Sequence, residues 1–350
     1  MKSISGFVTL IMCLLLAAPS QVVGQDDPHL PYLIYSTGLS IINIAWTPDS
    51  TSIIYQIENY DNVLDRPING PNTPNFDTWR QYFVATRQTS RGTVWPLQPT
   101  VTAQQIQNFE IYTDGDTPSF VFRSPDGRYI AYSGLLPSDA GYDPSLGIAD
   151  LETNTHRILA EEVNIERNDF LGVFEHYNIQ WSDDSSAFTL ASGLGSGLYH
   201  ISQLNDLNTL VVRWLSHYDG LPIGAERYRA TNSFDISADG ARLLLDGFYL
   251  GSPTQSSPFV LWDVTTNSGT PIPSEGKVVG ATFIHNDQRV LYVDGEGLKQ
   301  YDIAKDQVTL LNPDINSTWG IGGAYFSPNN RYVAIRAGIQ SLYLFEIIPD

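Results

Sequence analysis

The chain has 350 residues, of which 42% are hydrophobic and 16% are charged. This composition supplies enough apolar surface for a folded core and excludes an intrinsically disordered chain. The 19 Lys and Arg residues are outnumbered by 38 Asp and Glu residues, so the net charge is −19. Sequence-independent binding to nucleic acid or to an anionic membrane needs clustered cations, and the charge therefore argues against both.

Residues 1–24 have the pattern of a signal peptide. Lys2 precedes an apolar run over residues 7–18, and small residues follow before Gln25, which we expect to be the mature N-terminus. The apolar run is shorter than the roughly 20 residues of a membrane-spanning helix. Every Cys and Met lies in residues 1–24, so residues 25–350 can form neither a disulfide nor a cysteine-ligated zinc site. We predict a secreted or periplasmic protein without a membrane span.

Residues 25–350 repeat one hairpin motif six times. Each copy has a strand, a tight turn and a second strand, and the second strand places large apolar residues with a period of two, which is typical of one buried face of a strand. Asp and Asn hydrogen-bond their own backbone in turns, and one of them stands at the same turn position in every copy. The aligned turn residues are Asp49, Asp126, Asp184, Asp239, Asp287 and Asn329.

The spacing between the hairpins predicts a β-propeller. The shortest spacing, between the last two copies, matches the roughly 40 to 45 residues of a four-stranded blade. Two further strands are expected after each hairpin, for example over residues 81–87 and 93–97 in the first copy. The sixth copy lacks its fourth strand, and residues 31–36 (PYLIYS) supply a spare one. We therefore expect a single all-β domain over residues 25–350, a six-bladed propeller of four-stranded antiparallel blades closed by the N-terminal strand.

Two of the copies resemble a known repeat. SPDGRYIAY at residues 124–132 and SPNNRYVAI at residues 327–335 look like the WD-like propeller repeat of TolB-type proteins, and the six copies cover nearly the whole chain after residue 24. TolB itself has an additional N-terminal α/β domain, for which there is no room before the first hairpin. The third and fifth copies, at residues 181–186 and 284–289, lack the Pro and Gly of the motif. The resemblance implies a propeller that binds a protein or peptide outside the cytoplasm.

Long connections are expected on one face of the propeller, over blades 1 to 4. Loop length varies at little cost in stability, so a face with long loops is typical of a binding surface. This long-loop face comprises residues 58–78, 98–118, 133–145, 161–175, 216–231 and 248–257. The candidate binding residues, near the expected central channel, are Arg167, Asp169, Glu175, His176, Tyr218, Asp219, Arg227, Tyr228 and, entering blade 6, Trp319.

Motifs for catalysis are few. The six His residues form no H-E-x-x-H zinc motif, and the chain has no G-x-S-x-G nucleophile elbow. Glu175 and His176 are adjacent, and adjacent residues of an extended chain point to opposite sides. No cofactor is predicted, although the Asp-Gly-Asp run at residues 114–116 could bind calcium with the help of loop carbonyls. His285 replaces the Ser of the turn motif, and we expect it to be a capped structural residue.

Three functions from different classes stay open. The first, which we favour, is a monomeric, non-catalytic module outside the cytoplasm whose long-loop face binds a protein or peptide rather than a small molecule. The second is a carbohydrate-active or other small-molecule enzyme at the channel mouth, which would need two carboxylates, or a carboxylate and a His, within catalytic reach. The third is a structural envelope component without a discrete ligand.

Overall fold

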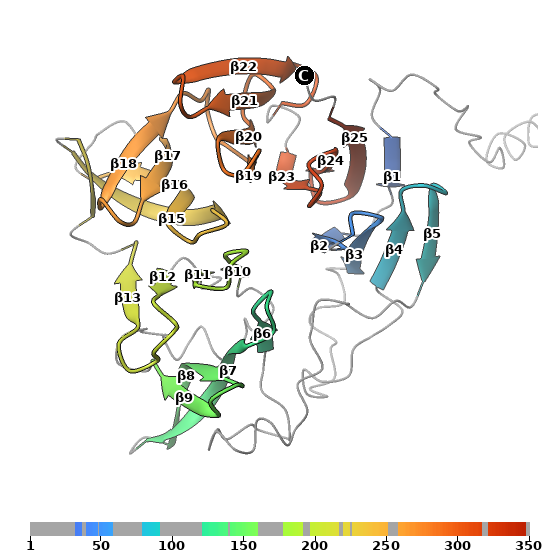
Figure 1. Ribbon diagram of the computed structural model, residues 1–350. Helices are drawn as coiled ribbons and strands as arrows, with labels where there is room; N and C mark the ends of the chain where they lie inside the picture. The colour runs from blue at the N-terminus through green and yellow to red at the C-terminus, as the bar shows by residue number, and fades with distance from the viewer. Residues whose placement is uncertain are drawn as a thin grey trace, which may run out of the picture.

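A computed structural model describes residues 32–36, 40–47, 49–58, 79–91, 121–138, 141–159, 178–191, 197–216, 220–224, 226–250, 258–316 and 321–347. Within these residues all regular structure is β-strand. Twenty-five strands form six antiparallel sheets, and the described part of the chain contains no helix (Figure 1). The expected all-β class is confirmed.

We number the sheets 1 to 6 in the order of their hairpins along the chain. Sheets 1 to 3 have four strands each, hydrogen-bonded in chain order. Their strands are β2 (Ser40–Trp46), β3 (Ser52–Glu58), β4 (Trp79–Phe83) and β5 (Gln88–Arg91) in sheet 1; β6 (Val121–Arg123), β7 (Tyr129–Ser138), β8 (Gly141–Asp150) and β9 (Thr155–Ile158) in sheet 2; and β10 (Asn178–Trp181), β11 (Ala187–Ala191), β12 (Leu198–Ser202) and β13 (Val211–Trp214) in sheet 3.

Sheet 4 has five strands, and sheets 5 and 6 have four strands each. Their strands are β14 (Leu221–Ile223), β15 (Glu226–Ile236), β16 (Arg242–Tyr249), β17 (Phe259–Asp263) and β18 (Ser268–Ile272) in sheet 4; β19 (Gly280–Ile284), β20 (Arg289–Val293), β21 (Leu298–Asp302) and β22 (Gln307–Asn312) in sheet 5; and β23 (Ile321–Phe326), β24 (Tyr332–Ala337), β25 (Ser341–Glu346) and β1 (Tyr32–Ser36) in sheet 6.

The sheets are arranged in a circle around a common centre, with β2, β6, β10, β15, β19 and β23 nearest to it (Figure 1). These inner strands pack against one another: β15 contacts β10 and β19, and β23 contacts β19 and β2. Radial placement of four-stranded sheets around a central channel is the arrangement of a β-propeller.

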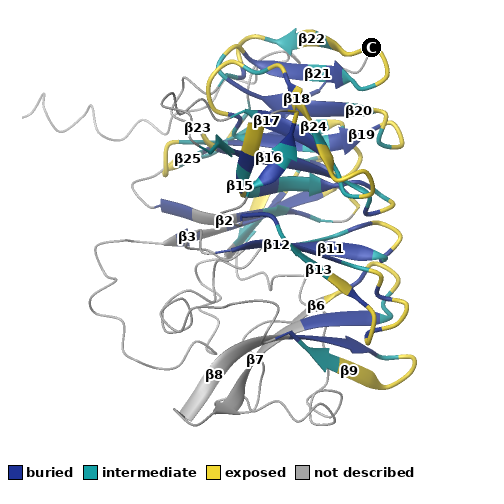
Figure 2. Ribbon diagram, turned by 90° about the vertical axis from the view of Figure 1, so that its left-hand side faces the viewer, coloured by how far each residue is buried: buried dark blue, intermediate teal, exposed yellow. Residues whose placement is uncertain are grey.

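The hydrophobic core lies between neighbouring sheets. Each buried cluster draws its side chains from two neighbouring sheets, as when Leu244 and Phe259 of sheet 4 pack with Phe283 and Tyr292 of sheet 5. Figure 2 shows that most buried residues lie in the strands. The exposed turns gather along one edge of the molecule, at the right of the view. The period-two apolar residues of the repeats supply this packing, because alternate residues of a strand point to the same face.

The N-terminal strand β1 joins the last sheet. It pairs antiparallel with β25, with Tyr32 opposite Leu344 and Ser36 opposite Ser341. The Tyr32 ring also lies 5.9 Å from the ring of Tyr82 in sheet 1, measured between centroids. This strand therefore belongs to sheet 6 by hydrogen bonding and contacts sheet 1 by its side chains.

The tight turn of the repeat is held by a hydroxyl group. In the turn between β15 and β16, the Ser237 hydroxyl donates to Asp239 Oδ1 at 2.6 Å and accepts from the backbone N–H of Arg242 at 2.8 Å. The N–H of Ala241 also donates to Asp239 Oδ1. In four other hairpins the corresponding N–H donates to a hydroxyl, which belongs to Thr47, Ser124, Ser182 or Ser327.

Sheet 4 differs from the expected four-stranded pattern. Residues 216–231 were expected to form a loop, but Leu221–Ile223 pair with Glu226–Tyr228 as an additional hairpin. Leu221 and Ile223 are both buried, and Gly224 provides the positive φ of 59° that the short turn requires. Burial of these two side chains against the sheet explains the fifth strand.

The outer strands of sheet 1 also differ from the prediction. Residues 84–87 form a turn, closed by a hydrogen bond from Arg87 N to Phe83 O at 2.9 Å, so the third strand ends at Phe83. The fourth strand then occupies Gln88–Arg91 rather than residues 93–97, which lie outside the described residues. Arg87 adopts a positive φ of 55°, which the sequence pattern does not indicate.

Candidate functional site

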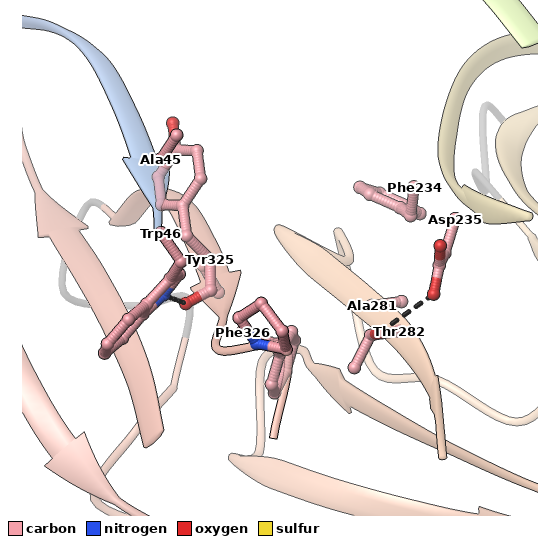
Figure 3. Close-up of a pocket in the computed structure, with 10 residues that line it drawn as sticks. Ala45, Trp46, Phe234, Asp235, Ala281, Thr282, Tyr325 and Phe326 are labelled. Carbon is pink, nitrogen blue, oxygen red and sulfur yellow. Dashed lines mark hydrogen bonds between the residues drawn. The ribbon is translucent and has the colours of Figure 1, made fainter. Parts of the chain in front are cut away.

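A pocket of about 280 Å³ lies at the centre of the circle, between inner strands of sheets 1, 4, 5 and 6 (Figure 3). We call it the central pocket. Its lining residues are Ala45 and Trp46 of β2, Phe234 and Asp235 of β15, Ala281 and Thr282 of β19, Ala324, Tyr325 and Phe326 of β23, and Pro328. On β2, β15 and β23 these residues stand at the carboxyl end of the strand, directly before the tight turn.

Hydrogen bonds between neighbouring inner strands hold the walls of the pocket. Trp46 Nε1 donates to Tyr325 O at 2.8 Å and joins sheet 1 to sheet 6. Ala324 N donates to Val279 O at 2.9 Å and joins sheet 6 to sheet 5. At Gly280 a Cβ atom would lie 2.2 Å from Ala324 O, so this close approach of two backbones requires glycine. The pocket is therefore preformed by links between sheets.

Asp235 joins sheet 4 to sheet 5 and is the one carboxylate among the lining residues. Its Oδ2 accepts hydrogen bonds from Thr282 Oγ1 and Phe283 N, both at 2.8 Å, and its Oδ1 accepts from Ile236 N at 2.9 Å. A carboxylate has about four acceptor positions, so three bonds leave capacity for one more. Burial raises the pKa of Asp235 to about 6, against the opposing effect of these hydrogen bonds.

One further acidic group, Asp287, acts on Asp235 from the side of the tight turns. Asp287 raises the pKa of Asp235 further through its charge. The pKa of Asp287 is itself raised, first by burial and then by the charges of Asp239 and Asp183. Arg242 offsets part of this charge, with its Nη2 at 4.0 Å from Asp287 Oδ2. Negative charge therefore predominates at this end of the pocket.

Aromatic side chains form the apolar walls. Trp46 stacks on Tyr332 with 6.2 Å between ring centroids, and Phe234 meets Phe259 edge-on at 5.8 Å. Tyr325 and Phe326 are only partly buried. Packing against neighbouring rings fixes Trp46 and Phe234, so the walls keep their shape without a ligand.

Asp235 is the single acidic side chain in the lining of the central pocket. Acid–base hydrolysis of a glycoside needs two carboxyl groups on either side of the reacting bond, and Asp235 has no second carboxylate or His beside it in the lining. No group of three or more His, Cys, Asp or Glu side chains that could hold a metal ion is found in the described residues. The calcium candidate at residues 114–116 lies outside them.

Most of the residues predicted for the long-loop face lie outside the described residues. These are Arg167, Asp169, Glu175, His176, Tyr218, Asp219 and Trp319. Arg227 is exposed on β15, as a binding residue would be. Tyr228 is completely buried, and its hydroxyl donates to Pro258 O at 3.1 Å, so the structure gives it a packing role. Both residues stand at the opposite end of β15 from Asp235.

The central pocket was not predicted from the sequence, although one signal was available. The fourth residue before each turn residue lies on the inner strand, and in the six copies it is Ala45, Phe122, Gln180, Asp235, Phe283 and Tyr325. Asp235 is the one carboxylate in this column. A charged side chain at an otherwise apolar or neutral inner position indicates a special environment.

Comparison with known proteins leaves the family open. No protein-family model and no curated protein matches the chain. Among solved structures, TolB from Acinetobacter baumannii is similar, with a TM-score of 0.36, 17% identity and coverage of 89% of this chain and 55% of that chain. This chain thus spans about half the length of that TolB.

Two further solved structures show a similarity of the same order. An oligogalacturonate lyase in complex with manganese has a TM-score of 0.42 and 11% identity, with coverage of 89% of this chain and 78% of that chain. A chain of a mitotic checkpoint complex has a TM-score of 0.40 and 10% identity, with coverage of 95% and 100%. The propeller-type fold rests on the six sheets and their pairing.

In the described part of the chain, no helix is long and apolar enough to cross a membrane.

Proposed function

We propose that this chain is an exported, non-catalytic, six-bladed β-propeller that binds a protein or peptide partner. The signal-peptide pattern of residues 1–24 supports export to a secreted or periplasmic location. Six sheets around one centre, and the pairing of β1 with β25, support a ring closed by the N-terminal strand. Closure in this way pairs the open edge of β25 and joins the two ends of the chain.

The central pocket carries the binding function. It is concave, it is mostly apolar with few polar groups, and it lies where inner strands of four sheets meet, which are the usual properties of a ligand site. Its single carboxylate already accepts three hydrogen bonds, so it is positioned to hold a ligand rather than to exchange protons with a second catalytic group.

The long-loop face is the second surface on which a partner could extend. Arg227 is its described and exposed candidate. Because Arg227 and Asp235 stand at opposite ends of β15, substitutions at these two residues separate binding on one face of the ring from binding on the other.

Selection of peptides tests the proposal. The chain is expressed with its own first 24 residues, recovered outside the cytoplasm and immobilised, and a phage-displayed library of random dodecapeptides is selected on it. We expect related sequences to be enriched, and the synthetic peptides to bind with micromolar Kd in fluorescence anisotropy. Mass spectrometry of the N-terminal tryptic peptide should show that it begins at Gln25.

Two results would contradict the proposal. Enrichment no greater than on an empty support would exclude recognition of peptide segments, and retention of the whole chain in the cytoplasm would exclude export. Arg227→Ala serves as the comparison for the long-loop face: loss of binding in this variant but not in Asp235→Asn would assign the partner to that face.

A further inference from the structure

The charge and shape of the central pocket identify the kind of group that it binds. We propose that the pocket formed by Trp46, Phe234, Asp235, Thr282, Tyr325 and Phe326 receives one basic side chain, Lys or Arg, of a bound peptide segment. The inference rests on the proposed function, because the bound segment delivers the side chain.

Asp235 provides the anionic contact. Its carboxylate lines the pocket and has acceptor capacity beyond the three hydrogen bonds that it already accepts. The nearby carboxylates of Asp287, Asp239 and Asp183 add negative potential, of which Arg242 neutralises only a part. A cation that enters the pocket gains a charge-assisted hydrogen bond and relieves the repulsion among these carboxylates.

The aromatic walls suit the rest of a basic side chain. Lys and Arg have an apolar stem that packs on hydrophobic surface while the charged end meets a polar group. The faces of Trp, Tyr and Phe rings also attract cations directly. Trp46 and Phe234 are held in place by their neighbours Tyr332 and Phe259, so little side-chain freedom is lost on binding.

The size and position of the pocket favour a side chain of a polypeptide. A volume of about 280 Å³ is at the lower end of the range for ligand pockets, which suits a single side chain. Pro328, at the edge of the pocket, belongs to an exposed tight turn. The described hairpin turns around the pocket are all short, so a partner main chain can lie across this face while one side chain enters.

The experiment measures the Kd of the selected peptides by fluorescence anisotropy on wild type and on two variants that remove the same charge. Asp235→Asn is expected to weaken binding at least tenfold. Asp314→Asn, at an exposed residue outside the pocket lining and outside this acidic group, is expected to change Kd less than twofold. Replacement of the essential Arg of the peptide by citrulline, or of Lys by norleucine, should weaken binding to wild type tenfold and have little further effect on Asp235→Asn.

A second variant protects the test against misfolding. Phe326→Ala removes an aromatic wall without removing any of the three hydrogen bonds of Asp235, and it is expected to weaken binding of the basic peptide about threefold. The thermal midpoint of each variant is measured by circular dichroism alongside Kd.

The outcomes separate this inference from the proposed function. Selected peptides that contain no essential basic residue, or that bind Asp235→Asn as tightly as wild type, would overturn the inference that the pocket receives a basic side chain. The proposal of a peptide-binding propeller would still stand. If no peptide is selected, calorimetric titration with n-butylguanidinium decides: heat that is lost in Asp235→Asn supports the cation pocket without the peptide, and absence of heat overturns it. If n-butylguanidinium binds as tightly as the best peptide, the ligand is a free small cation. This result would overturn the inference that a peptide delivers the basic group.

Discussion

Two neighbouring hairpin turns reverse the chain with different stabilising hydrogen bonds. The turn between β15 and β16 uses Ser237 and Asp239 for its internal hydrogen bonds and places Gly240 at a φ of 68°. The turn between β19 and β20 has no such hydroxyl, and His285, Asn286 and Asp287 follow one another at φ values of 53°, 53° and 62°. Each non-glycine residue in this region costs on the order of 1 kcal/mol.

The strained turn is compensated by its neighbour. Asp287 Oδ2 accepts a hydrogen bond from Ala238 N, in the β15–β16 turn, at 2.8 Å. His285, which we expected to be a capped structural residue, is instead an exposed turn residue. In this copy the turn motif departs from its consensus, and a link between sheets replaces the link within the turn.

Serine at the glycine position also makes a link between neighbouring sheets. Ser50 and Ser185 stand at φ values of 59° and 61°, where two other copies have Gly. The Ser50 hydroxyl accepts from Asn329 N, and the Ser185 hydroxyl accepts from Asp126 N, both at 3.0 Å. Each of these donors belongs to the hairpin of the adjacent sheet, so the hydrogen bond offsets the strain of a side chain at positive φ.

The largest expected effect concerns His200, which ties the β15–β16 turn to sheet 3. Its Nε2 donates to Gly240 O at 3.1 Å, and burial lowers the pKa of His200 to about 4. As the pH falls from 6.5 to 4, the unfolded chain takes up a proton that the folded chain excludes, so the free energy of unfolding should fall by about 3 kcal/mol from this group. Urea unfolding at pH 7 and pH 4 measures it.

The control for this effect is His200→Gln, which can still donate to Gly240 O but does not titrate. Between pH 7 and pH 4 the free energy of unfolding of this variant should lose about 3 kcal/mol less than that of wild type. The raised pKa values of Asp235 and Asp246 act in the opposite direction in both proteins and cancel in the difference. Equal pH dependence in the two proteins would show that His200 titrates normally.

The second prediction removes the hydroxyl from the unstrained turn. Ser237 is completely buried, and Ser237→Ala leaves the N–H of Arg242 without its acceptor. We expect a loss of about 2 kcal/mol in the free energy of unfolding. Thr265→Ala, which removes an exposed turn hydroxyl that donates to Asp263, is the control and should cost less than about 0.5 kcal/mol. Similar losses in both variants would mean that burial of the Ser237 hydroxyl does not increase its contribution to the free energy of unfolding.

The third prediction breaks the link between the two turns. Asp287→Ala removes the acceptor of Ala238 N and is expected to cost about 1 kcal/mol in chemical unfolding. Asp183→Ala removes an exposed carboxylate from the same face and should be close to neutral. An Asp287→Ala variant as stable as wild type would refute the compensation described above.

The smallest expected effect relieves the strain itself. His285→Gly places glycine at a φ of 53° in an exposed position, and the thermal midpoint should rise slightly, for a gain of about 0.5 kcal/mol. Gly adopts this φ without a Cβ clash, and the gain is limited because Gly also loses more freedom on folding. A lower midpoint would indicate a contact of the imidazole that stabilises the turn.

Prediction from sequence succeeded where the determining contacts are local. The turn residues Asp126 and Asp239 lie in turns as expected, since the carboxylate of each accepts a hydrogen bond from the backbone N–H two positions later. The additional strand β14 was missed because it depends on the burial of Leu221 and Ile223 against a sheet that forms from later residues. Local patterns do not contain that partner.

The central pocket depends on residues that are far apart in the chain. Trp46 and Tyr325, joined by one hydrogen bond, are separated by 279 positions. The sequence shows that Asp235 is the one carboxylate among the six aligned residues that stand four positions before the turn residues. The rise in its pKa, however, comes from burial, which occurs only when the chain packs beside Thr282 and Phe283.

Composition, charge and the repeated hairpin were therefore sufficient for the all-β class and for the alternation of buried and exposed residues, because these follow from periodicity and from turn chemistry within a few residues. Tertiary packing decided which strands become neighbours around the centre and where the turns link adjacent sheets. It also decided that four inner strands line an acidic, aromatic pocket. The physical reason is that hydrogen bonds between sheets and desolvation of Asp235 exist only when distant segments meet.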